Sequence, residues 1–327
     1  MSPVGTGDAC QYARALLTAD LTSVQVKERH EGFFTSVLRV ECPSCLPGHD
    51  IALKVLRPEL ERKGVALGQH LFDNELNFFE SGTQAADHVP NLLGSKLDET
   101  DPRLALNWVR GDHSQFISPE VAARCLDRYS SMQADWSRGV VALEPRRTEV
   151  HDGALDEVLE HALGILIDDF RAHDVPGDLE EVAGWIGENY TSAFGRVSER
   201  SRRFLHLVHG DLRADNLVLS SSEVYFLDWQ RWSVGWAALD VATLVTQSVV
   251  FFETDDVLTM LSGAHRTCPN LGLPRDLVDW LDLVCVASFG PVVGYRLQGL
   301  SAREILFVRE SSAAALRALS ALLAHRR

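Results

Sequence analysis

The stretch from Leu207 to Gln230, LVHGDLRADNLVLSSSEVYFLDWQ, places four acidic residues, a histidine and an asparagine between apolar runs. Carboxylate and carboxamide oxygens are the ligands that a hard divalent cation prefers, and Asn216 and Asp228 can supply them from the ends of neighbouring strands. Asp211 lies five residues before Asn216, so a tight loop can aim its carboxylate across the same site at a hydroxyl. Arg213 stands where it could meet a phosphate during transfer. The spacing therefore predicts a metal and phosphate site.

Short apolar runs on either side of these residues predict the strands that position them. We expect strands at 204–208, 217–220 and 224–227, with the polar loop between the first two and Asp228 at the end of the third. This arrangement puts the polar side chains at strand ends.

Residues 21–56 read as a three-stranded antiparallel meander, which is followed by one main helix and two more short strands. Turn-rich segments at 27–32 and 43–49 separate the first three predicted strands, and Gly82 is placed to end the helix. The predicted strands are 21–26, 33–42, 50–56, 91–97 and 103–109, and the predicted helix is 65–82.

The chain changes character near residue 106 and is mainly helical afterwards. Helical spacing of apolar residues predicts helices at 118–136, 153–170, 178–194 and 301–325. We expect an α+β fold with a small antiparallel sheet lobe over 1–105, a hinge over 106–113, and a larger, mostly helical lobe over 114–327, with a cleft between the lobes.

The string HGDLRADN, followed by LDWQ with its aspartate twelve residues beyond Asn216, resembles the aminoglycoside phosphotransferase and choline kinase-like superfamily. That superfamily shares the bilobal protein kinase fold. The resemblance implies that Asp211 orients or accepts the proton of a substrate hydroxyl, and that Asn216 and Asp228 hold magnesium. It also implies ATP or GTP as the phosphate donor.

The resemblance extends to the nucleotide-binding part of the sheet lobe. Lys54, in the middle of the strand IALKVL, and Glu75, on the following helix, match the ion pair that grips the nucleotide phosphates. A turn in HEGFFTSVLRV would cover the phosphates, with backbone amides near Thr35 and Ser36 as contacts. Gly32 is its sole glycine, which makes this turn a weak signal.

The segment ALNWVRG resembles the hinge against which the nucleotide base packs, with Asn107 and Val109 as its contacts. Two further residues are expected to support the catalytic loop. His209 is assigned a packed, hydrogen-bonded organising role, and Asp240, in GWAALDVATL, resembles the helix aspartate that hydrogen-bonds this loop.

The spacing of Asp228 and Asp240 separates classes of kinase. Protein kinases have a long activation segment between these positions, whereas here the separation is twelve residues, so we expect a small-molecule acceptor with a hydroxyl. Trp229 and Gln230 stand where many relatives have other residues; they face the substrate or simply pack.

Two alternative functions stay open. One is a serine or threonine kinase acting on a biosynthetic precursor peptide, which would need an open groove. The other is a catalytically inactive, kinase-like nucleotide-binding protein. Intact Lys54, Asp211, Asn216 and Asp228 argue against the inactive form.

The amino-acid composition disfavours some classes of binding partner. With 46 acidic against 31 basic residues, the net charge of −15 disfavours nucleic acid and anionic membranes as partners. No signal sequence is evident and the apolar run VATLVTQSVVFF is too short to span a bilayer, so we expect a cytoplasmic protein. Six scattered cysteines fit reduced thiols.

Two local features of the sequence are weaker indications of a binding site. Segment 152–190 holds eleven acidic residues against one arginine, and a solvated helix face is favoured over attraction of an amine-bearing substrate such as an aminoglycoside or peptide antibiotic. The acceptor itself stays open among an antibiotic, an amino alcohol or another metabolite. Cys42, Cys45 and His49 have plausible zinc spacing but lack an evident fourth ligand, so a plain turn is expected.

Overall fold

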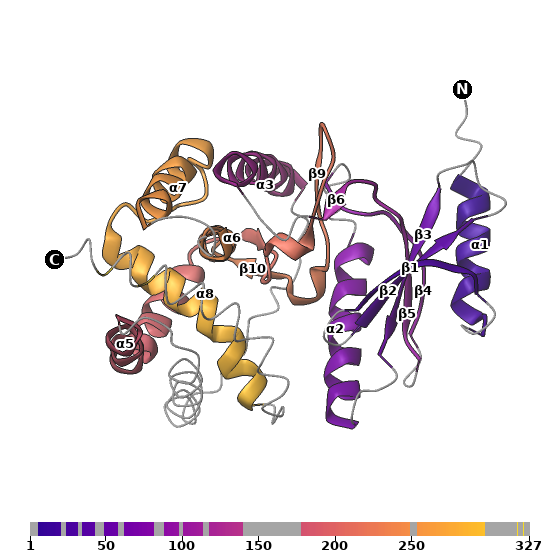
Figure 1. The fold of residues 1–327 in the computed structure, drawn as a ribbon, viewed down its shortest axis with the longest axis horizontal. Coiled ribbons are helices and arrows are strands. Elements are labelled where there is room, and N and C mark those ends of the chain that lie inside the picture. The colour runs from indigo at the N-terminus through magenta and orange to yellow at the C-terminus, as the bar shows by residue number, and fades with distance from the viewer. Residues whose placement is uncertain are drawn as a thin grey trace. The chain divides into compact units, whose positions relative to one another are not determined.

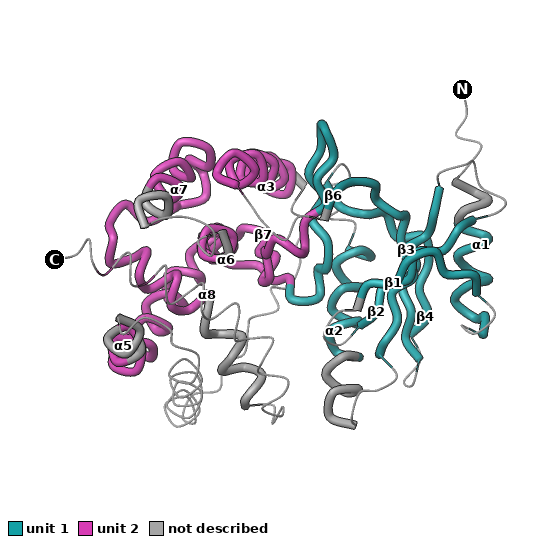
Figure 2. Tube along the Cα trace, in the orientation of Figure 1, with its two compact units in different colours: residues 1–112, 218–231 teal, residues 113–217, 232–327 magenta. Residues whose placement is uncertain are grey.

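The computed structural model describes most of the chain as two compact units (Figure 2). Unit 1 comprises Met1–Asp112 and Val218–Arg231, and unit 2 comprises His113–Leu217 and Trp232–Arg327. The described residues are 6–20, 24–31, 35–42, 49–57, 62–81, 88–97, 101–113, 118–139, 178–248, 254–297, 319 and 323.

Unit 1 is built on a five-stranded antiparallel sheet with the order β1-β2-β3-β5-β4 (Figure 1). Its strands are β1 (Val26–Glu31), β2 (Thr35–Glu41), β3 (Asp50–Leu56), β4 (Leu92–Lys96) and β5 (Arg103–Asn107). The strands predicted at 33–42, 50–56, 91–97 and 103–109 are present as β2 to β5, and β2 and β3 pair antiparallel, as the predicted meander requires.

The first predicted strand is wrong in position. β1 runs through the charged residues Lys27 to Glu31, where a turn was expected. β1 is an exposed edge strand, so charged side chains cost little there and make cross-strand ion pairs. Arg39 contacts Glu28 at 2.5 Å and Lys27 contacts Glu41 at 3.2 Å.

Helices cover opposite faces of this sheet (Figure 1). α1 (Thr6–Thr18), which the sequence analysis did not predict, packs through Leu16 and Leu17 on a cluster that includes Leu53 and Val55 of β3. Successive strand residues face opposite sides, so Lys54 points away from α1. The other face carries α2 (Arg62–Glu80), the predicted main helix.

A second, small sheet of unit 1 carries the turn that contains Asp228. It has the order β6-β8-β9, with β6 (Asp112–His113), β8 (Leu217–Leu219) and β9 (Val224–Phe226), and its first two strands include the boundary residues of the units. A short 3₁₀ helix, η3 (Trp229–Arg231), follows β9. The predicted strands at 217–220 and 224–227 are thus confirmed.

Unit 2 is mainly helical. The helices predicted at 118–136 and 178–194 are present as α3 (Pro119–Gly139) and α5 (Asp178–Ser201). Three further helices follow: α6 (Ala238–Ser248), α7 (Thr254–Thr267) and α8 (Leu277–Leu297). The helix predicted at 153–170 and nearly all of that at 301–325 lie outside the described residues.

The core of unit 2 surrounds α6, which packs against α3, α7 and α8. Its residues Val241, Ala242, Leu244 and Val245 are fully buried. The strand pair β7 (His206–Val208) and β10 (Ser233–Gly235) lies in the same unit and leads into the polar loop. No helix in the described part of the chain has both the length and the apolar content needed to cross a bilayer.

The prediction of six reduced thiols is wrong at Cys42, which is disulfide-bonded to a partner outside the described residues. The scatter of cysteines along a chain does not show which of them pair, which explains the error. Cys10, Cys125, Cys268 and Cys285 are free.

Candidate active site

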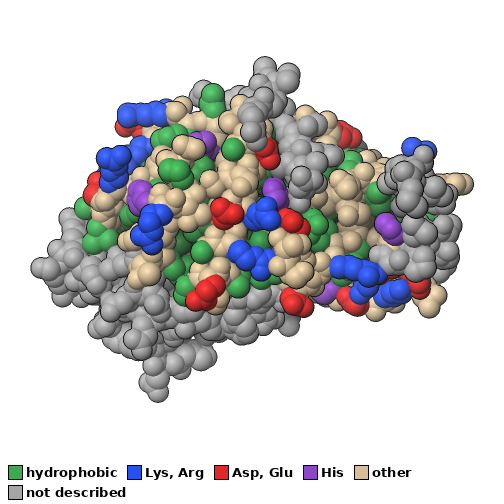
Figure 3. All heavy atoms as spheres, turned by 90° about the horizontal axis from the view of Figure 1, so that it is seen from above, with side chains coloured by type: hydrophobic (Ala, Val, Ile, Leu, Met, Phe, Trp, Pro, Cys, Tyr) green, Lys and Arg blue, Asp and Glu red, His purple; other side chains and the backbone are tan. Residues whose placement is uncertain are grey.

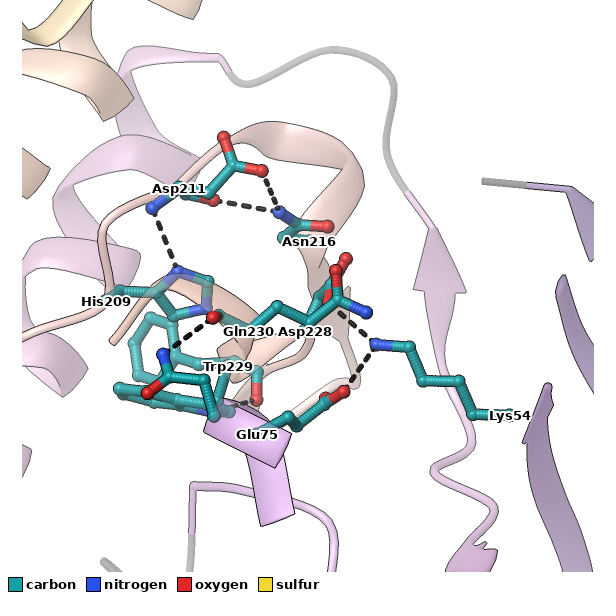
Figure 4. Close-up of polar contacts among 10 residues, drawn as sticks. Lys54, Glu75, His209, Asp211, Asn216, Asp228, Trp229 and Gln230 are labelled. Atoms are coloured by element: carbon teal, nitrogen blue, oxygen red, sulfur yellow. Dashed lines mark hydrogen bonds and ion pairs between the residues drawn. The ribbon is translucent and has the colours of Figure 1, made fainter. Parts of the chain in front are cut away.

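Three predicted site residues meet in unit 1 (Figure 4). The Nζ atom of Lys54 lies 2.7 Å from Oε2 of Glu75 and 2.7 Å from Oδ1 of Asp228. Lys54 comes from the centre of β3 and Glu75 from α2, and both are almost completely buried. The side chain of Asp228 is 34% exposed, so the carboxylate end of this cluster is the part open to a ligand.

Burial and charge act in opposite directions on Lys54. Burial lowers the pKa of its amine, but the charges of Asp228 and Glu75 outweigh that effect and raise the pKa above its ordinary value. For Glu75, burial raises the pKa, Lys54 opposes the rise, and Asp228 adds to it. Lys54 therefore carries a positive charge in a place where an anion can be bound.

The backbone turn at Asp228 aims this carboxylate. Asp228 has a φ of 64°, a left-handed conformation that is uncommon for residues other than glycine. Such strain persists only where the surroundings fix it, and it is frequent at functional sites. The strained turn is thus a second sign, independent of the ion pair, that Asp228 belongs to a binding site.

Helix α2 supplies the contacts that fix this turn. Nδ2 of Asn74 donates to the backbone oxygen of Gln230 at 2.7 Å, and the backbone N–H of Trp229 donates to Glu75. The indole of Trp229 stacks on Phe78 with ring centroids 4.1 Å apart. The element that carries Glu75 therefore also holds the residues that follow Asp228.

Five predicted residues meet in unit 2, in and behind the polar loop. Nδ2 of Asn216 donates to the backbone oxygen of Asp211 at 2.8 Å and to its Oδ2 at 3.3 Å (Figure 4). Asn216 ends the 3₁₀ turn η2 (Ala214–Asn216). The two polar residues are therefore held together by the short loop, as their spacing suggested.

His209 and Asp240 support this loop from within unit 2. The backbone N–H of Asp211 donates to Nδ1 of the fully buried His209 at 3.3 Å. Asp240 accepts the backbone N–H of His209 at 2.6 Å and that of Gly210 at 2.9 Å. Tyr129 donates its hydroxyl to the same carboxylate at 2.5 Å. The carboxylate of Asp240 thus fixes the backbone that leads to Asp211.

Burial raises the pKa of Asp240, and the nearby His209 and the hydrogen bonds from Tyr129 and the loop oppose that rise. Burying a carboxylate is costly unless donors surround it. Asp240 meets this condition, since three donors surround its carboxylate: the backbone N–H groups of His209 and Gly210 and the hydroxyl of Tyr129.

Arg213 lies beside the loop aspartates. Its Nε is 3.2 Å from Oδ1 of Asp211, and its Nη2 is 2.7 Å from Oδ2 of Asp215. The guanidinium therefore lies next to the carboxylate expected to orient a hydroxyl.

The predicted nucleotide contacts at Thr35 and Ser36 lie at the start of β2. Both are buried, and the Oγ of Ser36 accepts a bond from Arg29 at 3.4 Å. Gly32, which was expected in the same turn, lies outside the described residues.

The predicted hinge contacts lie at the end of β5, with Asn107 as its last residue and Val109 just beyond it. The backbone N–H of Asn107 donates to the backbone oxygen of Asn91 at 3.0 Å, and that of Trp108 donates to Asp50 at 2.9 Å. Val109 is the next residue and is partly exposed. The start of the hinge is therefore anchored to two neighbouring segments of unit 1.

Several supporting residues escaped the sequence analysis. Asn74 is adjacent to Glu75 in the string DNE, but nothing in that string indicates a bond to Gln230. Tyr129 and Gln133 both bond the backbone of Leu207 from 74 or more residues away. Contacts of such separation leave no local pattern.

Comparison with known proteins shows which of them this chain is similar to. Residues 199–271 match the model of the phosphotransferase enzyme family, APH. No match was found among curated protein sequences.

Solved structures with a similar fold cover nearly the whole chain. A choline kinase from Cryptosporidium parvum Iowa II is 11% identical, with a TM-score of 0.55, over 97% of this chain and 94% of that one. A microcompartment-associated aminopropanol kinase is 15% identical, with a TM-score of 0.58, over 94% of each chain. An amicoumacin kinase in complex with AMP-PNP and Ca²⁺ is 13% identical, with a TM-score of 0.53, over 93% of this chain and 92% of that one.

At these identities the structural likeness establishes the fold, and the family match over residues 199–271 includes the polar loop, Asp228 and Asp240. The predicted α+β, protein-kinase-like fold class is therefore confirmed. The resemblance to the aminoglycoside phosphotransferase and choline kinase-like superfamily is confirmed as well.

Proposed function

We propose that the protein is an ATP- or GTP-dependent O-phosphotransferase that phosphorylates a hydroxyl group of a small molecule. The observation that carries this proposal is the buried cluster of Lys54 with Glu75 and Asp228, joined by 2.7 Å ion pairs. A buried amine held in its charged form, next to a partly exposed carboxylate, suits a phosphate chain and its counter-ion. The kinase neighbours and the phosphotransferase family match support the same reaction class.

The residues present fit a divalent cation. Asn216 directly precedes β8 and Asp228 follows β9 by two residues, and β8 and β9 are adjacent strands. A carboxylate in a strained turn and a carboxamide offer the oxygen donors that magnesium takes. Asn216 and Asp228 would hold magnesium, which when bound would neutralise charge on the phosphates.

In this mechanism Lys54 binds phosphate oxygens of the nucleotide, and Glu75 keeps the amine in place. Asp211 orients the acceptor hydroxyl and takes its proton late in the transfer. Asn216 holds the Asp211 carboxylate through its Nδ2 donor. Arg213, beside Asp211, would contact the phosphate as it moves.

Thr35 and Ser36 are proposed to border the phosphates, and Asn107 and Val109 to border the base. These roles rest on the order of the elements, since β2 precedes β3 with Lys54 and the hinge follows β5.

The acceptor is proposed to be a small molecule, favoured over a peptide. Between Asp228 and Asp240 the chain forms only η3, β10 and the start of α6. Such a short connection leaves no segment that would dock a peptide. The similar structures include choline, aminopropanol and amicoumacin kinases, which favours an amine-bearing alcohol as the acceptor.

The test is nucleotide consumption in the presence of magnesium across hydroxylated amines, sugars, aminoglycosides, choline and peptides. We expect turnover with at least one small molecule. Asp211→Asn keeps the size of the side chain but removes the charge of the base, so transfer should fall roughly 100-fold or more.

The same variant should bind magnesium nucleotide with near wild-type affinity by calorimetry. A wild-type protein that binds nucleotide but turns over no acceptor, and matches Asp211→Asn in every assay, would instead be an inactive nucleotide-binding protein.

A further inference from the structure

Gln230 has a buried donor that no described residue satisfies. The residue is 8% exposed, and its Nε2 atom has no hydrogen-bond partner among the described residues. Its backbone oxygen, in contrast, accepts the bond from Asn74. The backbone is therefore fixed by α2, while the amide nitrogen at the end of the side chain is left without an acceptor.

The side chain points into the cluster described above. In Figure 4 the Gln230 carboxamide extends from the turn toward the ends of Lys54 and Asp228. All three residues belong to unit 1. An unpaired donor in a buried place is costly, and a bound acceptor would remove that cost.

The neighbouring charges indicate which acceptor fits. Lys54 offers only donors, so the two nitrogen groups together would suit an anion with several acceptor oxygens. A water bound to a metal would not serve, because its lone pair faces the metal and its hydrogens point outward as donors. A phosphate oxygen accepts from both groups.

We propose that the Gln230 carboxamide donates a hydrogen bond to an oxygen of the nucleotide phosphate chain, beside the Lys54 amine. This proposal rests on the proposed phosphotransferase function and adds a phosphate-binding residue two positions after the metal aspartate. If the amide were turned over, its carbonyl oxygen would face the phosphate and repel it. Bound phosphate therefore selects the orientation with nitrogen inward.

Two substitutions of Gln230 test the contribution of its amide donor. Gln230→Met keeps the length of the side chain and removes the donor, and Gln230→Glu replaces the donor with an anion. Losing one hydrogen bond to a charged group weakens binding roughly 10- to 100-fold. By calorimetry with magnesium, AMP-PNP or GMP-PNP should bind Gln230→Met weaker by that factor, and Gln230→Glu weaker still. Affinity for the corresponding nucleoside, which has no phosphate, should not change.

Gln133 provides the matched control for stability. Its amide is also buried, but Nε2 donates to the backbone oxygen of Leu207, and Oε1 accepts the Leu207 N–H at 3.0 Å. Gln133→Met should therefore lower the melting temperature of the ligand-free protein. Gln230→Met should leave it unchanged or raise it, since it removes a donor that has no partner.

Three results would overturn the proposal. Gln230→Met could bind the triphosphate analogue as tightly as wild type, which would show that the amide does not contact phosphate. It could lose nucleoside and triphosphate affinity equally, with a lower melting temperature, which would show a purely structural role. Wild type could fail to bind any magnesium nucleotide, in which case the proposed function fails and this contact with it. The first two results leave the phosphotransferase function intact.

Discussion

Lys54 is the single positive charge between two carboxylates in a buried cluster, so its removal leaves like charges facing each other. Its amine opposes the rise in the pKa of Glu75 that burial produces. Breaking a buried ion pair by removing one partner is strongly destabilising, whereas an exposed pair contributes little.

We therefore predict that Lys54→Met lowers both nucleotide affinity and the free energy of unfolding, the latter by about 3 kcal/mol at pH 8. A carboxyl whose folded pKa is raised stabilises the fold at low pH and loses that contribution as the pH rises through the folded pKa. Without Lys54 the pKa of Glu75 rises further, so the deficit should be smaller at pH 5.

Urea unfolding at pH 5 and pH 8 measures this difference. Lys96→Met is the control, because Lys96 pairs with Asp101 at 3.0 Å while its side chain is 30% exposed. It should change the free energy of unfolding by less than about 1 kcal/mol at either pH. An equal deficit for Lys54→Met at both pH values would contradict the assigned charges.

Asp228 combines a charge with a left-handed backbone, and two substitutions separate these properties. Asparagine tolerates a φ of 64° better than alanine does. Asp228→Asn should thus fold with a higher free energy of unfolding than Asp228→Ala, by about 1 kcal/mol. Both variants should lose phosphoryl transfer, because neither can neutralise the phosphates through a metal.

Chemical denaturation and turnover of the two variants test this prediction together. Full activity in either variant would remove Asp228 from the metal site. Equal stability of the two would mean that the turn is not strained.

At the scale of elements, α6 positions the polar loop that carries Asp211 through one side chain, Asp240. Asp240 receives bonds from two successive backbone N–H groups, of His209 and Gly210, and from the hydroxyl of Tyr129. In Asp240→Asn the amide nitrogen would face one of these donors. We expect a loss of about 2–3 kcal/mol in the free energy of unfolding, and a lower turnover number.

Tyr129→Phe is the matched variant, because it removes one donor and leaves both backbone bonds to Asp240. Its cost should be about 1–2 kcal/mol, with the turnover number reduced less than in Asp240→Asn. If Tyr129→Phe were the more damaging of the two for turnover, the loop would not be held chiefly by the Asp240 carboxylate.

The sequence predicts an element well where its signal is local. Asp211 and Asn216 lie five residues apart in one loop, so their proximity follows from spacing, and it is confirmed by their hydrogen bonds. The helix α2 shows apolar residues at helical spacing, and β3 is an almost continuous apolar run because it lies in the interior of the sheet and is buried along most of its length.

Elements without a local signal were missed or misplaced. β1 is an exposed edge strand whose charged residues read as a turn, and its strand conformation depends on pairing with β2. The N-terminal helix α1 is stabilised by packing on the sheet, which no local sequence pattern shows. The bonds of Tyr129 and Gln133 to Leu207 join segments far apart in sequence, so no pattern could reveal them.

At the scale of the whole molecule, the net charge of −15 is not gathered into one acidic region on the face shown in Figure 3, where basic and acidic side chains are interspersed. Interspersed charges cancel at short range, and salt screens what is left beyond about 8–10 Å. On this face, attraction of a cationic molecule would therefore come from carboxylates within a few ångströms of it.

Binding of magnesium nucleotide should stabilise the folded chain as a whole. A ligand that binds only the folded state adds about 2.7 kcal/mol at a concentration 100 times its Kd. For 327 residues, with an unfolding entropy of about 2.1 cal/mol/K per residue, this corresponds to a rise in Tm of about 4 °C.

We predict this rise for wild type and for Asp211→Asn, since the base matters for transfer and not for nucleotide affinity. Asp228→Asn should show little or no rise, because it lacks the carboxylate that would hold magnesium with the nucleotide. Differential scanning calorimetry with AMP-PNP or GMP-PNP, with and without magnesium, measures all three proteins under the same conditions. A full rise in Asp228→Asn would separate this residue from nucleotide binding, and loss of the rise in Asp211→Asn would mean that Asp211 contributes to the nucleotide site itself.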